Sequence, residues 1–304
     1  MTKIENSFPG KDISSDDIQT KFPLAAKKSV DHKSIVKVGN IAFGDIHVPV
    51  MGGPNTVESL DLILKCAHHA KKCHIDILRG GAYKPLTFPY RSDKYFETRS
   101  EGIEWLGRAK RETGLLTVSE IVHEDQLYEM ESNVDILQIG TRNMQNFPLL
   151  LHCARSGKPI LLKRGFGSSI RDLLGAAEHI LLEGNSQVIL CERGVVAPHT
   201  HRASSRFLLD LQAVPALHEI THLPVVVDPS HACFWAPWVP ALAKASIASN
   251  ADGLMLEFHP DPCNAAVDPL QPLSFEEIED LMPILSDVAR AANQRLLGGA
   301  KLKT

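Results

Sequence analysis

Short runs of consecutive apolar residues recur along the chain from residue 47 onward. Each run is apolar at successive positions and does not alternate with polar residues, which is typical of parallel strands buried on both faces. The eight runs are HVPVMGG (47–53), IDILRGG (75–81), LLTVSEI (115–121), DILQIG (135–140), PILLKRG (159–165), QVILCERG (187–194), LPVVVDPS (223–230) and DGLMLEFHP (252–260). Segments with helical character separate them, among them residues 59–73, 103–112, 170–184 and 239–250.

This rhythm of a strand followed by a helix predicts one α/β domain, a (β/α)8 barrel over residues 31–304. Residues 34–45 read as a short β-hairpin with its turn at Gly39-Asn40, placed to cap the bottom of the barrel. An open doubly wound sheet is the alternative, but it usually has fewer strands and a GxGxxG turn after the first, and that turn is missing here. Residues 1–30 are expected to be disordered or extended. Ser274 and Glu277 have the spacing of a capping box, which predicts a last helix over 274–297.

The composition of the chain indicates which classes of binding partner to expect. The 304 residues are 44% hydrophobic and 22% charged, with a formal net charge of −4, so a dominant nucleic-acid surface is not expected. No apolar run approaches the ~20 residues that cross a bilayer. The six cysteines include no CxxC pair and are interpreted as reduced thiols. We therefore expect a cytoplasmic protein that acts on small molecules, with neither a membrane nor a nucleic acid as its partner.

Five cationic side chains lie at or just after the ends of the predicted strands. In a barrel these ends meet at one rim, where catalytic groups are found. Converging cations repel one another unless an anion compensates them, so the set predicts a pocket for a small, highly charged anion such as a phosphorylated carboxylic acid. For any single residue the alternative is an ordinary solvated strand end. The five are Arg79, Lys84, Arg142, Lys163 and Arg193.

A second group of polar residues suggests a metal. His231, Glu257 and Asp268 follow neighbouring strands, and imidazole with two carboxylates is a plausible set of ligands for a divalent cation. The alternative is that they are hydrogen-bonded loop residues. Cys66, His69 and Cys73 fall on one helical face and are interpreted as surface chemistry, not as a metal site.

Eight motifs in order make a specific resemblance. They are GGPNTVES, RGGAYKP, QIGTRNMQNF, LLKRG, AAEHILLEGN, LCERG, DPSHA and LEFHPDP. Together they resemble the type I family of 3-deoxy-heptulosonate-7-phosphate (DAHP) synthases, in the subgroup close to the 3-deoxy-octulosonate-8-phosphate synthases. Those enzymes are TIM-barrel transferases that condense phosphoenolpyruvate (PEP) with an aldose phosphate. The similarity runs from about residue 30 to about residue 290.

The resemblance implies roles for the residues that match its motifs. Arg79, Lys84, Arg142, Lys163 and Arg193 would hold PEP, and Lys84, His231 and Glu257 would be catalytic. His231, Glu257 and Asp268 match three of the four metal ligands of the family. The fourth is a cysteine in a GPC turn, and here that turn reads GPN with Asn55. A neutral amide binds metal more weakly than a thiolate, so we expect either no required cofactor or a weakly bound divalent metal (Mn, Mg or Zn).

Segments on the acceptor side depart from the family. After the active-site lysine, heptulosonate synthases usually read KPRTS, whereas this chain reads KPLTF with Leu86, Thr87 and Phe88. Phe207 replaces the Asn of RNTLD, and Phe234 and Trp235 follow SHAC where the family often has Gly-Arg-Arg. These changes predict an acceptor that is less anionic and more apolar than erythrose 4-phosphate, as in specialised metabolism.

Two alternatives to that function stay open. One is an ordinary DAHP synthase that uses erythrose 4-phosphate in the shikimate pathway. The other is a barrel without catalytic activity that binds PEP or a partner protein. The family's assemblies imply a homo-oligomer, a dimer or a tetramer, and the length of the chain leaves no room for the regulatory domains of some members.

Overall fold

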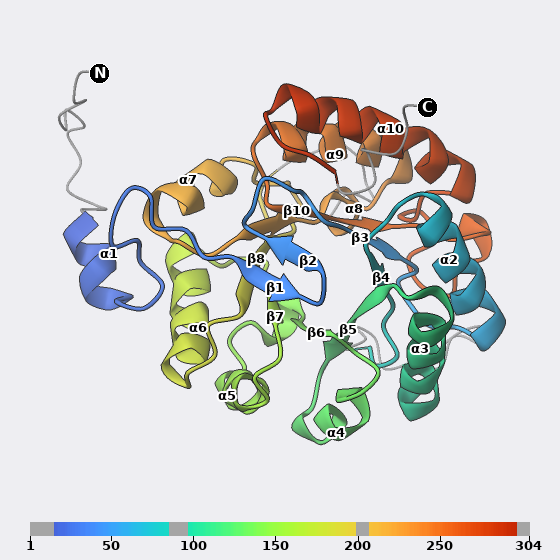
Figure 1. The fold of residues 1–304 in the computed structure, drawn as a ribbon, viewed down its shortest axis with the longest axis horizontal. Helices are drawn as coiled ribbons and strands as arrows, with labels where there is room; N and C mark the ends of the chain where they lie inside the picture. Colours follow the sequence, from blue (N-terminus) through green and yellow to red (C-terminus); the bar gives the residue numbers. More distant parts are fainter. Residues whose placement is uncertain (1–14, 85–96, 199–206, 297–304) are drawn as a thin grey trace.

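Eight parallel strands close into a barrel in the computed structural model of the chain, which describes residues 15–84, 97–198 and 207–296 (Figure 1). The order around the barrel is β10-β3-β4-β5-β6-β7-β8-β9, so consecutive strands are neighbours throughout. The strands are β3 (Val50–Gly53), β4 (Ile77–Arg79), β5 (Leu116–Ile121), β6 (Ile136–Ile139), β7 (Ile160–Lys163), β8 (Val188–Glu192), β9 (Val225–Val227) and β10 (Gly253–Glu257). Each of the eight predicted runs contains one strand, and the barrel prediction is confirmed.

Helices surround the strands on the outside of the ring (Figure 1). They are α1 (Ser15–Lys21), α2 (Leu60–Lys72), α3 (Arg99–Thr113), α4 (Leu127–Met130), α5 (Phe147–Arg155), α6 (Ile170–Leu182), α7 (Ala213–Ile220), α8 (Pro229–Cys233), α9 (Val239–Ala248) and α10 (Phe275–Ala291). Short 3-10 helices are η1 (Glu124–Gln126), η2 (Thr141–Asn143), η3 (Ala236–Trp238) and η4 (Pro262–Asn264). The predicted capping box is present at the start of α10, where Ser274 accepts from the backbone N–H of Glu277 at 3.2 Å and the Glu277 carboxylate accepts from the N–H of Ser274 at 2.7 Å.

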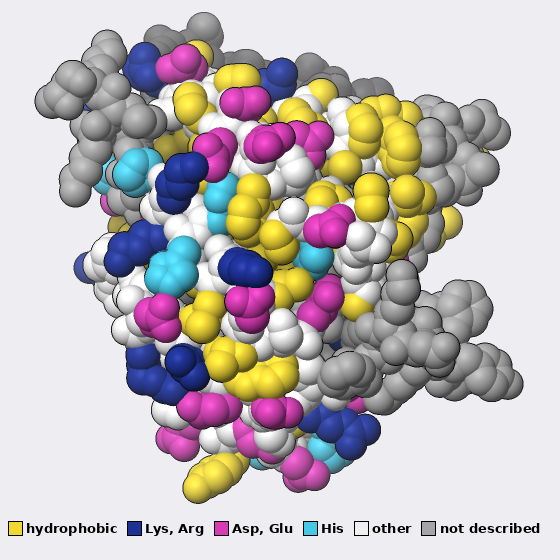
Figure 2. Space-filling view, turned by 90° about the vertical axis from the view of Figure 1, so that its right-hand side faces the viewer, with side chains coloured by type: hydrophobic (Ala, Val, Ile, Leu, Met, Phe, Trp, Pro, Cys, Tyr) yellow, Lys and Arg dark blue, Asp and Glu magenta, His cyan; other side chains and the backbone are white. Residues whose placement is uncertain are grey.

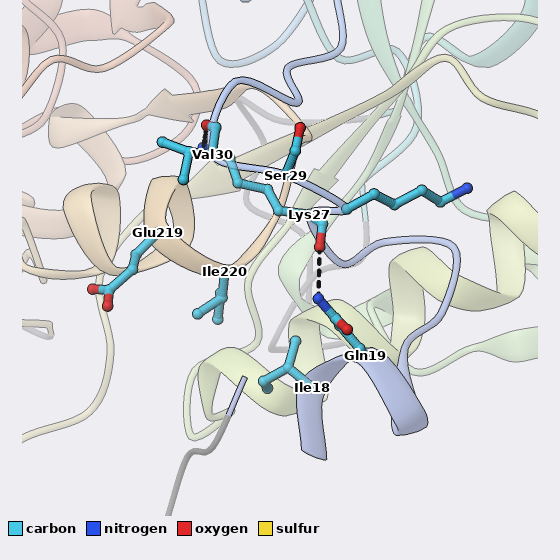
Figure 3. A pocket seen from close by; sticks show the side chains of 8 residues that line it. Ile18, Gln19, Lys27, Ser29, Val30, Glu219 and Ile220 are labelled. Carbon is cyan, nitrogen blue, oxygen red and sulfur yellow. Dashed lines mark hydrogen bonds between the residues drawn. The ribbon is translucent and has the colours of Figure 1, made fainter. Parts of the chain in front are cut away.

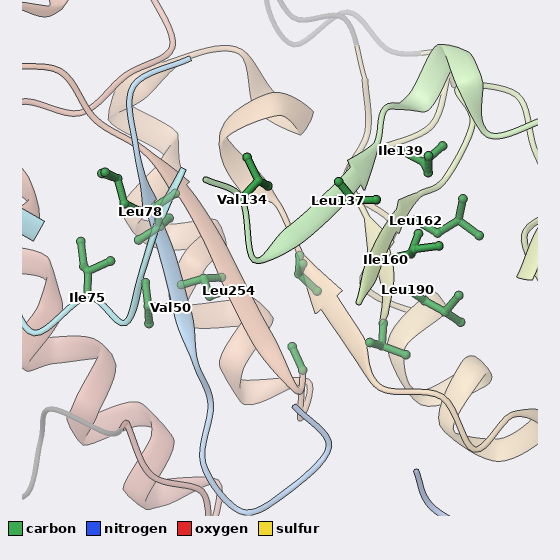
Figure 4. Close-up of a cluster of buried hydrophobic side chains, with 14 of the residues drawn as sticks. Val50, Ile75, Leu78, Val134, Leu137, Ile139, Ile160, Leu162, Leu190 and Leu254 are labelled. Carbon is green, nitrogen blue, oxygen red and sulfur yellow. The ribbon is translucent and has the colours of Figure 1, made fainter. Parts of the chain in front are cut away.

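Two separate cores explain why the strands are apolar at every position. Alternate side chains such as Val50, Leu78 and Leu254 belong to a cluster beneath the helices, part of which is drawn in Figure 4. Their neighbours, for example Met51 and Ile77, belong to a second cluster inside the barrel. A strand whose two faces are both covered gains from burial on each side, so no polar alternation is needed.

The predicted hairpin closes one end of the barrel. It consists of β1 (Val36–Val38) and β2 (Ile41–Phe43), joined by a turn in which Gly39 has φ +57°. The four buried hairpin side chains pack in the inner cluster together with at least one residue of every barrel strand. A Cβ at Gly253 would lie 3.1 Å from the Phe43 ring, so the small residue in β10 leaves room for the hairpin.

The N-terminal segment differs from its prediction, because α1 is a helix within residues expected to be disordered or extended. Tertiary contacts hold this segment against α6. Asp17 lies 2.5 Å from the Arg171 guanidinium, and the Glu178 carboxylate accepts from the N–H groups of Leu24 and Ala25, each at 2.8 Å. A local pattern of residues does not reveal such partners, since they lie about 150 positions away in the sequence.

On the side where α2 and α3 lie, acidic, basic and apolar side chains are interspersed (Figure 2). Among the helices that the structure describes, none is both long and apolar enough to cross a membrane. All six cysteines fall within the described ranges and are free thiols.

Candidate active site

Charged side chains gather where the barrel strands end. Arg79, Lys163, Glu192 and Glu257 are the last residues of β4, β7, β8 and β10, and all four are buried. Arg142 lies in η2 after β6, Arg193 follows β8, and His231 lies in α8 after β9. The (β/α)8 topology thus brings residues far apart in sequence to one rim, as predicted from the strand ends.

Two of the predicted cations have buried carboxylate partners. Arg79 Nη1 lies 3.0 Å from Glu257 Oε2, and Lys163 Nζ lies 2.6 Å from Asp228 Oδ2. The side chains of both pairs are at most 5% exposed. A charge at this depth needs a partner, so the mutual repulsion of the cations is already reduced before any anion binds.

A chain of contacts runs from Lys163 through Asp228 to His231. His231 Nδ1 lies 2.9 Å from Asp228 Oδ2, and its Nε2 lies 3.5 Å from Glu257 Oε2. Burial, opposed by the charge of Asp228, holds the pKa of His231 well below its usual range. Burial disfavours the ionised form of Asp228, but the hydrogen bond from His231 and the charge of Lys163 outweigh it and hold the pKa of that carboxyl well below normal. His231 is therefore a neutral imidazole whose Nδ1–H faces a carboxylate, which leaves Nε2 as the basic nitrogen.

Lys84 folds back into the same site. Its Nζ donates a hydrogen bond to Asn55 Oδ1, and a Cβ at Gly81 would lie 2.9 Å from that Nζ, so glycine at this position lets the ammonium lie close to the backbone. Burial lowers the pKa of Lys84 to about 8, with Arg79 acting in the same direction and Glu120 opposing. A lysine with this pKa is still protonated at neutral pH and can also release a proton there.

The pKa of Lys84 predicts opposite pH trends for anion affinity and for stability. Loss of the ammonium charge above pH about 8 should weaken PEP binding by up to about tenfold per pH unit, because the bound anion favours the protonated lysine. The contribution of Lys84 to the free energy of unfolding should instead rise as the pH increases from about 8 to the ordinary pKa of lysine. The reason is that the folded state binds this proton less tightly than the unfolded state does. Calorimetric titration with PEP in buffers of different ionisation enthalpy should show proton uptake above pH 8. A titration without proton uptake would contradict the assignment.

The predicted metal ligands are engaged with other groups. Asn55 Oδ1 accepts from Lys84, and Glu257 Oε2 accepts from Arg79 and from Gln271 Nε2, the latter at 2.6 Å. Asp268 is close enough for its charge to raise the pKa values of Glu257 and Lys84. Within the described part of the chain, His231, Glu257 and Asp268 do not bring their ligand atoms within 4.8 Å of one another. This arrangement does not fit a tightly bound metal. Asn55 Oδ1 stands where the family's thiolate would be, and it already accepts a hydrogen bond from the Lys84 ammonium.

One described group, at the C-terminal end of α2 and on α10, could hold a metal: His69, Cys73 and Glu279, whose ligand atoms all lie within 4.8 Å of one another. The interpretation of Cys66, His69 and Cys73 as surface chemistry was wrong, because all three are buried. Their helical face turns inward against α10, and the His69 ring stacks on Phe275 at 3.8 Å. Glu279 is already paired, because Lys72 Nζ lies 2.6 Å from its carboxylate. Burial raises the pKa of Cys73 to about 11, which disfavours the thiolate that a metal would bind.

The acceptor-side residues divide into three groups. Leu86, Thr87 and Phe88 lie outside the described residues. Phe207 lies beside one of the five cations, because its ring centre is 4.3 Å from the Arg193 guanidinium. Phe234 and Trp235 lie between α8 and η3, next to the loop that carries Asp268, and the N–H of Ala236 donates to Leu270 O at 2.8 Å.

Three residues of the site were not proposed as site residues from the sequence: Asp228, Gln271 and Phe166. Asp228 had a usable signal, because a carboxylate directly after an apolar buried strand implies a buried cationic partner. Glu192 carries the same signal, because it directly ends another apolar strand. Its Oε2 lies 2.9 Å from Arg164 Nη1, so Arg164 is its buried cationic partner. Gln271 and Phe166 act through contacts between distant loops, for which the linear sequence gives no spacing.

A separate surface pocket lies outside the barrel, between α1 and the end of α7 (Figure 3). Ile18, Gln19 and Ile220 line it together with the segment 27–30 and Glu219. Gln19 Nε2 donates to Lys27 O at 3.2 Å across it. None of the predicted site residues takes part in it, so the candidate chemistry remains at the strand ends.

Comparison with known proteins agrees with this geometry. The family model described as "DAHP synthetase I family" matches residues 22–294. The chain is 37% identical over 270 residues to the phospho-2-dehydro-3-deoxyheptonate aldolase of Thermotoga maritima, covering 89% of this chain and 78% of that protein. It is 27% identical to a 2-dehydro-3-deoxyphosphooctonate aldolase of Rhodopseudomonas palustris, covering 90% and 99%.

Solved structures give the same relationship. The crystal structure of the Thermotoga maritima DAHP synthase superimposes with a TM-score of 0.83 at 36% identity, covering 90% of this chain and 78% of that one. A truncated form of the 3-deoxy-D-arabino-heptulosonate 7-phosphate synthase from the same organism gives 0.82 at 34% identity, covering 91% and 99%. With a matched model over most of its length and a barrel of the same shape, the chain belongs to the DAHP synthetase I family, whose enzymes condense PEP.

Proposed function

We propose that this protein is a DAHP synthase, joining C3 of PEP to the aldehyde carbon of erythrose 4-phosphate with release of phosphate. The observation that supports this most directly is the rim of the barrel. There, Arg79, Lys84, Arg142, Lys163 and Arg193 lie at or after the ends of strands, as the His231–Asp228 pair does. The 37% identity to a DAHP synthase supports the same reaction.

The five cations would bind the phosphate and carboxylate groups of PEP. Arginine offers planar forks that match both anions, and lysine supplies a point charge. Because Arg79 and Lys163 are fixed by Glu257 and Asp228, their positions are set before the substrate arrives. Such preorganised charge lowers the cost of orienting PEP with C3 toward the acceptor.

Proton handling falls to Lys84, His231 and Glu257. As C3 of PEP attacks the aldehyde carbon, the carbonyl oxygen gains an electron pair and takes a proton, for which the Lys84 ammonium with its pKa of about 8 is suited. Water then adds to C2, and the neutral Nε2 of His231 can accept its proton, with Asp228 stabilising the imidazolium that forms. The resulting hemiketal phosphate breaks its C2–O bond to phosphate, the proton of the C2 hydroxyl group leaves with the phosphate, and the new ketone remains.

We propose further that no metal is required, or that a divalent metal binds only weakly. The donation from Lys84 to Asn55 supports this, since the ammonium supplies positive charge beside the reacting groups where the family's thiolate ligand would hold a metal. Turnover that is unchanged by EDTA and by added Mn²⁺ is the expected result. Loss of activity in EDTA that Mn²⁺ restores would contradict it.

A second candidate is the same condensation with a less anionic, more apolar acceptor. Leu86 and Phe88, in place of the family's Arg and Ser, favour it. The 37% identity to a DAHP synthase favours erythrose 4-phosphate, and Phe207, one of the residues that indicated an apolar acceptor, lies against Arg193 on the side of the predicted PEP site. We therefore place the sugar phosphate first.

Phosphate release from PEP decides between these candidates. With erythrose 4-phosphate we expect turnover that depends on both substrates, and Leu86→Arg should then change the KM for this acceptor little. No release with erythrose 4-phosphate, although PEP binds, would support the apolar acceptor, and Leu86→Arg should then create activity with the sugar phosphate. PEP binding without turnover with any aldehyde would indicate a barrel without catalytic activity.

The assembly and its place in the cell follow from the resemblance alone. We propose a cytoplasmic homo-oligomer, a dimer or a tetramer, built on one barrel domain over residues 31–304. Light scattering of the purified protein at several concentrations tests the assembly, and a monomer at every concentration would contradict it.

A further inference from the structure

Two aromatic rings lie beneath two of the cations. Phe166 and Phe207 stack with ring centres 4.8 Å apart and planes only 5° from parallel. The Arg193 guanidinium is 4.3 Å from the centre of Phe207 and 5.0 Å from that of Phe166. The Arg142 guanidinium is 5.4 Å from the Phe166 centre, so one ring serves two arginines.

An aromatic face holds a guanidinium in a different way from a carboxylate. A carboxylate takes up N–H donors and cancels charge, as Glu257 does for Arg79. The quadrupole of a ring attracts the cation through its face and orients its plane, and the ring itself takes up none of the in-plane N–H donors. The rim therefore contacts its cations in two ways: carboxylates lie against Arg79 and Lys163, and aromatic faces lie against Arg142 and Arg193. Arg193 Nη2 also donates to the backbone O of His231 at 3.0 Å.

The backbone is built to bring the two rings together. Phe166 follows β7 and its carbonyl accepts from the N–H of Val196 at 2.8 Å. Phe207 is held by an antiparallel bridge between Val195 and Leu208, with N···O distances of 3.0 and 2.9 Å. Gly194, between Arg193 and this bridge, has φ +95°, and a Cβ there would lie 2.9 Å from the Cβ of Phe207. Glycine at 194 is thus the condition for the close approach of Phe207.

We propose that Phe166 and Phe207 form an aromatic platform that positions Arg142 and Arg193 for the anionic groups of PEP. The inference rests on the proposed function and deepens it, since it assigns Phe207 to the donor side of the site. Both phenylalanines are positioning residues, because they act on the substrate through the two guanidiniums.

The test compares PEP affinity by calorimetry in wild type, Phe166→Leu, Phe207→Leu and the two tyrosine variants. Leucine keeps apolar volume but has no quadrupole, so each leucine variant should raise the Kd for PEP by about 3- to 30-fold. Phe166→Leu should have the larger effect, because this ring contacts both arginines. Tyrosine keeps the aromatic face and should stay within about twofold of wild type. In turnover, KM for PEP should rise while kcat and KM for the acceptor change little.

Phe22→Leu is the matched control. The Arg171 guanidinium lies 5.9 Å from the Phe22 ring, so this change removes a cation–π contact outside the site and should leave PEP affinity unchanged. If a leucine variant does not fold, methionine at the same position provides a second apolar, non-aromatic side chain, and its Kd is measured in its place.

The outcomes separate this inference from the proposed function. Equal PEP affinity in wild type and in the folded leucine variants would overturn the platform, as would a rise confined to KM for the acceptor, which would return Phe207 to the acceptor side. Wild-type protein that does not bind PEP would overturn the proposed function itself, and the platform with it. Weakened binding in the leucine variants with recovery in the tyrosine variants would support both.

Discussion

Lys84→Met should reduce the rate of phosphate release from PEP by about 100- to 1000-fold, the usual cost of removing one preorganised donor from an active site. Methionine keeps the length and most of the apolar volume of the side chain, but it removes the ammonium that contacts Asn55 and faces the charges of Glu120 and Glu257. Steady-state assays with saturating PEP and acceptor measure the effect on kcat. A variant that retains more than about a tenth of wild-type kcat would exclude Lys84 as the proton donor.

The same substitution should leave the fold as stable as before or more stable. Burial is the main cause that lowers the pKa of Lys84, so the site disfavours its charged form. Removing that charge relieves the penalty at pH 7, where lysine is ionised in both the folded and the unfolded state. Urea denaturation should therefore show an unchanged or increased free energy of unfolding. A clear loss of stability would mean that the missing activity reflects damage to the fold.

Asp228→Asn should lower the free energy of unfolding by about 3–5 kcal/mol, because it leaves the buried ammonium of Lys163 without its counter-charge. The Lys163 and Asp228 side chains are 4% and 0% exposed, and their charged atoms are 2.6 Å apart. Glu279→Gln provides a control at equal distance, since Lys72 and Glu279 also lie 2.6 Å apart but are 65% and 38% exposed. That change should lower the free energy of unfolding far less than Asp228→Asn does, because solvent screens the charges of an exposed pair.

A second substitution tests the cause of the destabilisation. Adding Lys163→Met to Asp228→Asn removes the orphaned charge, so most of the lost stability should return even though activity does not. Urea unfolding of the wild type, both single variants and the double variant gives the coupling energy. If the two effects simply add, the ion pair is not what makes Asp228 important to the fold.

The architecture was predictable from the sequence because the signal for a buried parallel strand is local. Eight apolar runs, each without polar alternation, match the eight barrel strands, and Gly39-Asn40 marks the hairpin turn. The helix α1 was not predicted, because Arg171 and Glu178 of α6 stabilise its segment from far along the chain. Local propensity contains no information on such partners.

The candidate site was predictable as a set of residue types and less so as a set of contacts. The strand ends identified Arg79, Lys163 and His231, since the topology fixes where these positions meet. The sequence did not show which acid neutralises which cation, nor that Asn55 and Glu257 would be engaged by Lys84 and Arg79. Phe207 shows the limit most clearly: its apolar character was visible, but its contact with Arg193 depends on the Val195–Leu208 bridge and on Gly194.

The hairpin that closes the barrel also sets an order of events during synthesis. Residues 36–43 leave the ribosome before any barrel strand. The cluster in which they are buried nevertheless includes Met255 of β10, the last strand to be made. Val36, Val38, Ile41 and Phe43 therefore wait, exposed, until more than two hundred further residues have been translated. A nascent chain that is arrested before β10 contains the hairpin but not the complete barrel that buries it. The apolar hairpin is then the segment to which a chaperone would bind.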